Sequence, residues 1–115
     1  MWKNTEEENN NLKKVKITVL RKEFYSDFAE EYLTDGREAG TCSLLEVGDV
    51  FVFEGGAEMP EGFCPWAWID IYRNVSAISQ GATYSPWNRK ENQTIVCCTD
   101  GIRPVVFHIE AINEN

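Results

Sequence analysis

The chain has 115 residues, of which 43% are hydrophobic and 12% aromatic, and its formal net charge is −8. This length and composition predict one domain with an ordinary hydrophobic core, which needs neither a metal nor a disulfide to hold it together. The acidic charge argues against nucleic acid and anionic membranes as partners, because phosphate groups are bound by clustered lysine and arginine.

The first half of the chain predicts a tail, a strand and a helix. Residues 1–12 are polar and acidic, which predicts a disordered tail ahead of a single globular domain over residues 13–115. VKITVL (15–20) alternates apolar and polar side chains as a strand does. In FYSDFAEEYL (24–33) the aromatic residues recur every four positions, which predicts an amphipathic helix that Asp35-Gly36 stops.

The second half predicts a strand, a helix and a hairpin. VFVF (50–53) reads as a strand that ends at Gly55-Gly56, and a helix is expected from Pro65, because proline is favoured at the first helical position. Residues 79–92 are expected to form a loop, and residues 94–112 a hairpin around Asp100-Gly101. Together these elements predict an α+β fold: a small, mainly antiparallel sheet of about four strands with two short helices packed on it.

Pro104 constrains the register of the hairpin, because proline has no N–H to donate to a neighbouring strand. A four-residue loop from Thr99 to Ile102 would pair Pro104 with Cys97 at a position where no hydrogen bond is needed, and we expect this loop. The alternative is that the second strand of the hairpin lies at the edge of the sheet.

Cys64 is the candidate catalytic residue. If Pro65 opens the second helix, Cys64 is its N-cap, where the helix dipole and the free N–H groups favour a thiolate over a thiol. The alternative is a small capping residue whose sulfur is half-buried between Phe63 and Trp66.

The other cysteines are Cys42, Cys97 and Cys98. Neighbouring residues of a strand point to opposite faces, and Cys98 shares the more apolar face, so we expect Cys98 in the core and Cys97 to be the functional one. The chain has no Cys-x(2–4)-Cys pair of the kind that structural zinc sites use. At most Cys42, Cys64 and one of the pair would converge, and three thiolates leave one coordination position open. Such a site would suit a catalytic or carrier metal, namely zinc, iron or copper.

Two tryptophans and one arginine are candidate ligand-binding residues. Trp66 and Trp87 each adjoin a proline, which would suit the lining of a flat pocket for a planar ligand. Arg103 is expected on the apolar face of Cys98, so it needs either a carboxylate partner or an anionic ligand. The common nucleotide-binding and hydrolase motifs are absent from the sequence.

Five segments occur along the chain in the order KVKITVLRKEF, EEYLTDGREAGTC, VGDVF, MPEGFCPWAWIDIY and IVCCTDGIRPVVFHIE. In this order they resemble a family of short, single-domain, cysteine-containing prokaryotic proteins, mainly from anaerobes, that are uncharacterised. The resemblance covers residues 13–112 and includes all four cysteines. The family pattern has proline after Cys42 and after Tyr72, where this chain has Ser43 and Arg73. The resemblance implies no activity.

The sequence therefore supports two hypotheses, and it leaves open whether the protein is an enzyme. In the first, cysteines clustered around Cys64 bind a soft metal or carry out thiol redox chemistry in a reducing cytosol. In the second, the protein is a non-catalytic binding module whose tryptophan-lined groove holds a planar ligand or a partner protein. We expect a cytoplasmic protein, because the chain shows no signal peptide and no apolar run near the about 20 residues of a bilayer-spanning helix. Both a monomer and a homodimer through a sheet edge fit the sequence.

Overall fold

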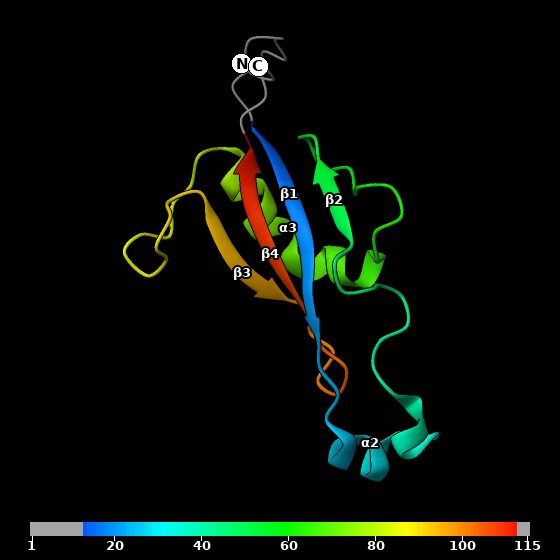
Figure 1. Ribbon diagram of the computed structural model, residues 1–115. Coiled ribbons are helices and arrows are strands. Elements are labelled where there is room, and N and C mark those ends of the chain that lie inside the picture. Colours follow the sequence, from blue (N-terminus) through cyan, green and yellow to red (C-terminus); the bar gives the residue numbers. More distant parts are fainter. Residues whose placement is uncertain (1–12, 113–115) are drawn as a thin grey trace.

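A four-stranded antiparallel sheet forms the centre of the structure (Figure 1). The computed structural model describes residues 13–112, so the predicted N-terminal tail (1–12) lies outside the described residues. The strands are β1 (Lys14–Lys22), β2 (Val50–Phe53), β3 (Gln93–Cys97) and β4 (Val105–Ile112), in the spatial order β2-β1-β4-β3. The helices are α2 (Ser26–Tyr32), the short 3-10 helix η1 (Gly36–Ala39) and α3 (Pro65–Ser79). The predicted α+β class is confirmed.

The sheet has one buried face and one open face, as the side chains of its two central strands show. Side chains alternate between buried and partly exposed along β4 and along most of β1, as the two-residue period of a strand requires. The register brings Ile17 of β1 opposite Ile109 of β4 and Phe51 of β2, while Val96 of β3 lies opposite Phe107. Every second residue therefore faces the same core.

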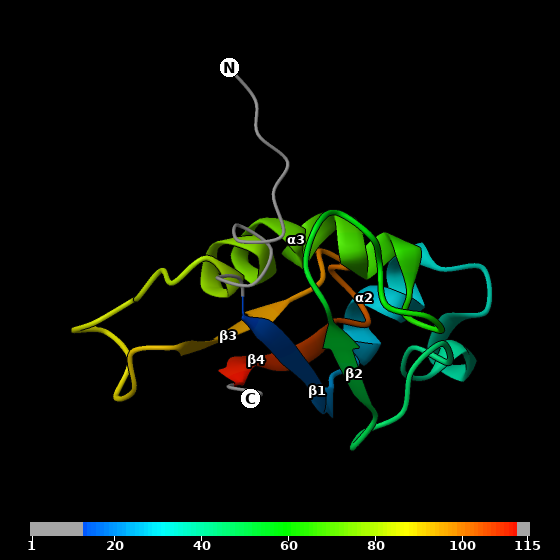
Figure 2. The same cartoon turned by 90° about the horizontal axis from the view of Figure 1, so that it is seen from above.

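Helix α3 covers the buried face of the sheet (Figure 2). Ala67, Ile71, Val75 and Ile78 are buried at helical spacing, which confirms the helix predicted from Pro65. The opposite side of α3 faces solvent, and Ile69 there is 77% exposed. No helix within residues 13–112 is long and apolar enough to cross a membrane.

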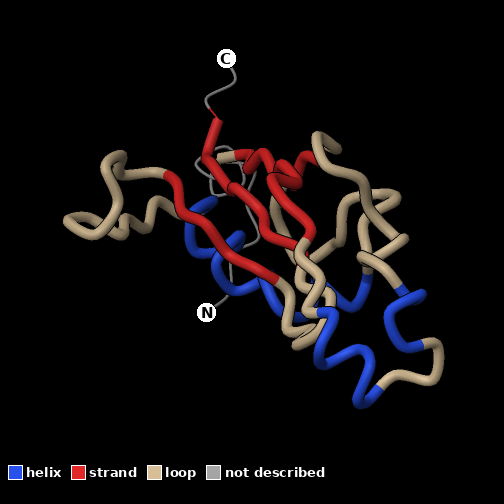
Figure 3. The backbone as a smooth tube through the Cα atoms, turned by 60° about the horizontal axis from the view of Figure 1, so that its bottom comes forward, coloured by secondary structure: helices blue, strands red, loops and turns tan. Residues whose placement is uncertain are grey.

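Helix α2 does not pack on the sheet, so that part of the prediction was wrong. It lies beyond the end of the strands and is followed there by η1 (Figures 1 and 3). Only Ala29 of α2 is buried, whereas Phe28 and Tyr32 are exposed. The backbone N–H of Tyr25 donates to the carbonyl of Ile102, which keeps the chain beside the β3–β4 loop after it leaves β1. The covered face of the sheet is already occupied by α3.

The β3–β4 hairpin has a longer loop than predicted. Cys97 pairs with Val106 instead of Pro104, and the N–H of Cys98 donates to the carbonyl of Val105. Pro104 immediately precedes β4, so its missing N–H removes no bond from the ladder. The alternative of β4 as an edge strand is also wrong, because β4 pairs with both β1 and β3.

Candidate functional site

The N-terminus of α3 places Cys64 at the edge of the core. Gly62 precedes it with a φ of 82°, a backbone conformation that side chains rarely tolerate, and this turn directs Phe63 and Cys64 inward. Cys64 then has an extended backbone and Pro65 begins the helix. The N–H of Ala67 donates to the Cys64 sulfur over 3.5 Å. The predicted N-cap role of Cys64 is thereby confirmed.

A pocket of about 360 Å³ opens beside this helix end. Its walls come from three parts of the chain: the loop ahead of β2, the first turn of α3 and the β3–β4 loop with the start of β4. Three of the four cysteines line it. The lining residues are Cys42, Ser43, Leu44, Leu45, Cys64, Trp66, Ala67, Cys98, Asp100, Arg103 and Val105.

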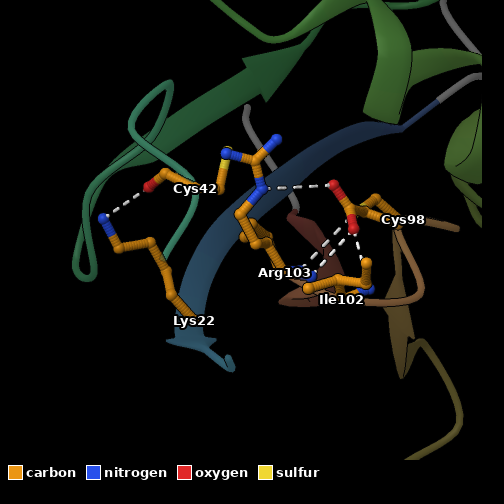
Figure 4. Close-up of polar contacts among 7 residues, drawn as sticks. Lys22, Cys42, Cys98, Ile102 and Arg103 are labelled. Atoms are coloured by element: carbon orange, nitrogen blue, oxygen red, sulfur yellow. Dashed lines mark hydrogen bonds and ion pairs between the residues drawn. The ribbon is translucent and has the colours of Figure 1, made fainter. Parts of the chain in front are cut away.

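Lys22 anchors the pocket wall that carries Cys42. Its Nζ atom donates a hydrogen bond of 2.9 Å to the backbone carbonyl of Cys42 (Figure 4). It donates another of 2.9 Å to the carbonyl of Leu45 and lies 3.6 Å from a carboxylate oxygen of Glu46. The Lys22 side chain is only 13% exposed. A charged ammonium that is mostly buried needs such acceptors, and here they fix a loop with no regular secondary structure of its own.

The two consecutive cysteines face opposite sides of the sheet, as predicted. Cys98 is buried and lines the pocket, and the N–H of Val105 donates to its sulfur over 3.3 Å. Cys97 is exposed and does not line the pocket. The structure therefore gathers Cys42, Cys64 and Cys98 around one space. The expectation that Cys97 is the functional member of the pair finds no support in this arrangement.

Arg103 and Asp100 are the charged residues of the pocket lining. Arg103 Nε lies 3.7 Å from Asp100 Oδ2, so a carboxylate is present as the partner that the apolar surroundings of Arg103 required. Asp100 Oδ1 also accepts the backbone N–H groups of Ile102 and Arg103, at 2.9 and 2.8 Å. Burial raises the pKa of Asp100. The two backbone hydrogen bonds and the Arg103 charge outweigh burial, so the pKa lies below its usual value.

The other predicted ligand-binding residues are not brought together. Within residues 13–112, no group of three or more His, Cys, Asp or Glu side chains is arranged to hold a metal ion. Trp66 lines the pocket and is 73% exposed, so its ring stands at the pocket rim. Trp87 lies on the loop between α3 and β3 and does not line this pocket.

Sequence reasoning missed two contributors to this site. The sequence placed Asp100 only in the predicted turn of the hairpin, whereas in the structure its carboxylate bonds the local backbone and pairs with Arg103, three residues along the chain. That spacing was the available signal. Nothing in the sequence indicated that Lys22 positions the pocket wall, because its acceptors are backbone carbonyl groups about 20 residues away in a loop.

The fold and the pocket define a small antiparallel α+β protein with a thiol-lined pocket. Comparison of the chain with protein-family models, with curated proteins and with solved structures gave no match. The family resemblance of its sequence segments therefore stays a prediction, and the function has to be argued from the site.

Proposed function

We propose that this protein carries out thiol redox chemistry on a small molecule in the pocket, with Cys64 as the nucleophile. The observation that supports this function is that three cysteines from distant parts of the chain line one pocket. All four cysteines are free, which fits a protein that works in a reducing cytosol.

Each pocket thiol has a role in the proposed reaction. The Cys64 sulfur accepts an N–H from the first turn of α3 and lines the pocket, and its thiolate is the form that reacts. The thiolate attacks a disulfide of the substrate, whose S–S bond breaks as a new one forms to Cys64. Cys42 or Cys98 then attacks the Cys64 sulfur and releases the second half of the substrate. The substrate gains the two electrons that the two protein thiols lose. A small cellular thiol then reduces the protein disulfide back to two thiols.

Soft-metal binding is the alternative chemistry that the sequence predicted for the clustered cysteines. The pocket thiols would take zinc, iron or copper only with rearrangement, because no group of ligands among the described residues is arranged for a metal ion. Metal analysis of protein purified without oxygen separates the two: the redox proposal predicts metal well below one equivalent per chain.

A second candidate function is non-catalytic binding of a planar ligand or a partner protein. The exposed indole of Trp66 at the pocket rim favours it, because an aromatic face beside an apolar cavity stacks on flat molecules. In that case the pocket thiols would be packing residues that do not react in the native fold.

The decisive experiment measures reaction of the native protein with a small uncharged disulfide. It uses a Cys97→Ser background, because Cys97 is exposed and would react with any reagent. We expect one fast pocket thiol that Cys64→Ser removes. The fold should survive, since serine is itself a favourable N-cap. A fast phase that persists in the Cys64→Ser variant would contradict the assignment of Cys64, and three inert thiols would favour the binding module.

A further inference from the structure

The guanidinium of Arg103 is incompletely satisfied by the protein. Its Nε atom is buried and has no hydrogen-bond partner within residues 13–112, because 3.7 Å from Asp100 is an ion-pair distance beyond hydrogen-bonding range. Figure 4 shows the side chains of Arg103 and Cys42 extending into the same region, and both residues line the pocket. The guanidinium therefore belongs to a pocket that also contains a thiol.

The rest of the pocket lining offers Arg103 no second anion. Asp100 is the other charged residue of the lining, and its Oδ1 atom is already engaged by two backbone N–H groups. The remaining lining residues are apolar apart from Ser43 and the three cysteines. An arginine has five N–H donors in a planar fork that matches the two oxygens of a carboxylate. A carboxylate or a similar planar anion is therefore the group that this site lacks.

We propose that Arg103 is the residue that determines substrate specificity in the pocket, and that the substrate is a small disulfide bearing a carboxylate. This inference rests on the proposed thiol function of the same site. A volume of about 360 Å³ is at the small end for ligand pockets, which suits a compact molecule rather than a protein segment. Trp66 at the rim is placed to cover a flat part of that molecule.

Arg103 would act by position rather than by taking part in the bond changes. It holds the carboxylate of the substrate while the Cys64 thiolate attacks the nearer sulfur. The S–S bond of the substrate breaks, one half stays on Cys64 as a mixed disulfide, and the other half leaves as a thiolate that takes a proton from water. Arg103 keeps its charge throughout.

The test compares two aromatic disulfide probes, one anionic and one uncharged, and follows how the ratio of their rates changes between variants. One is 5,5′-dithiobis(2-nitrobenzoate), which carries two carboxylates, and the other is the uncharged 4,4′-dithiodipyridine. Both release an absorbing product, so the rate of each is read directly. All proteins carry Cys97→Ser, and the measured quantity is the ratio of the anionic rate to the neutral rate.

We expect Arg103→Met to lower this ratio by about tenfold, which corresponds to one charge-assisted hydrogen bond. Arg103→Lys should restore part of it, because lysine keeps the charge but not the planar fork. The matched control is Arg21→Met, which changes the net charge equally but alters an exposed side chain outside the pocket lining. Arg21→Met should leave the ratio within about twofold, since charges on the surface are screened by salt.

A measurement on the protein with Arg103 intact covers the case that Arg103→Met fails to fold. Benzoate should slow the reaction with the uncharged probe, whereas benzamide, which has the same shape without the charge, should not. Equal effects of the two compounds would overturn the anion site.

The outcomes separate this inference from the proposed function. A fast reaction that depends on Cys64, with a ratio that Arg103→Met leaves unchanged, overturns the role of Arg103 but keeps the thiol function. Pocket thiols that react with neither probe overturn the thiol function itself, and the anion site as a substrate site with it.

Discussion

At the scale of single residues, Asp100 shows how a turn carboxylate organises one wall of the pocket. Its Oδ1 atom fixes the backbone of Ile102 and Arg103, and its charge faces the Arg103 guanidinium. Burial alone would raise the pKa of Asp100, but these contacts lower it below the usual value of about 3.9. A carboxyl whose folded-state pKa is depressed stabilises the fold above its unfolded pKa, and this stabilisation is lost as the pH falls through the folded pKa.

We therefore expect Asp100→Asn to reduce the free energy of unfolding by about 1 kcal/mol at pH 7, a modest value because solvent screens a partly exposed pair. The difference from the unchanged protein should shrink as the pH falls from about 4, where Asp100 is protonated in the unfolded chain, through the lower pKa of the folded protein. Urea denaturation between pH 7 and pH 2.5 measures this. Asp27→Asn, at an exposed position of α2, controls for the change in net charge. A difference that stays constant down to the lowest pH would contradict the assigned contacts.

Single residues were predictable where the cause is local. The N-cap role of Cys64 follows from the adjoining Pro65, and the opposite orientations of Cys97 and Cys98 follow from the geometry of a strand. The sequence allowed Cys42 and Cys64 to converge with either Cys97 or Cys98, and it did not require any convergence. The position of Cys42 depends on a loop that Lys22 holds through hydrogen bonds to backbone carbonyls. Every residue has a backbone carbonyl, so the residue types of the loop do not reveal these hydrogen bonds.

At the scale of elements, α2 and α3 have similar amphipathic patterns but different surroundings. The aromatic positions of α2 predicted a helix correctly, yet Phe28 and Tyr32 are exposed. The apolar positions of α3 are buried against the sheet. Periodicity identifies which residues share a face of a helix, but what covers that face depends on where the preceding chain leaves the sheet. The same limit applies to the hairpin, whose register was set by side-chain contacts of Asp100 within the loop.

Two isoleucines of α3 test whether this helix carries the core. Ile71 is fully buried and Ile69 is 77% exposed, although they are only two residues apart on the same helix. We expect Ile71→Ala to lower the free energy of unfolding by about 2–5 kcal/mol, because it leaves a cavity in a packed interior. Ile69→Ala should change it by less than about 0.5 kcal/mol. Urea denaturation of both variants gives the comparison, and equal effects would mean that α3 faces the sheet differently.

At the scale of the whole molecule, the sheet is covered by helix α3 on one face and, within residues 13–112, is left open on the other (Figure 2). Its open face carries several exposed apolar side chains, among them Val50, Val52 and Ile95, and the exposed Cys97 shares that face with Ile95. The thiol pocket lies on the other side, where α3, the loop ahead of β2 and the β3–β4 loop meet. The four cysteines are therefore divided between two environments that chemical labelling can tell apart.

The adjacent residues Cys97 and Cys98 report on this two-sided architecture. In the native protein, iodoacetamide should alkylate Cys97 nearly as fast as in urea-unfolded protein, because its side chain is exposed. Alkylation of Cys98 should be slower by about 100-fold or more, since its sulfur is buried at the pocket wall, where it accepts the N–H of Val105. Mass spectrometry of the two singly labelled forms, with fragmentation between the neighbouring residues, measures both rates.

The unfolded protein provides the control in which the two rates converge. Equal rates in the native protein would show that the β3–β4 hairpin does not hold the two sulfurs on opposite faces, and the pocket would then lose one of its three thiols.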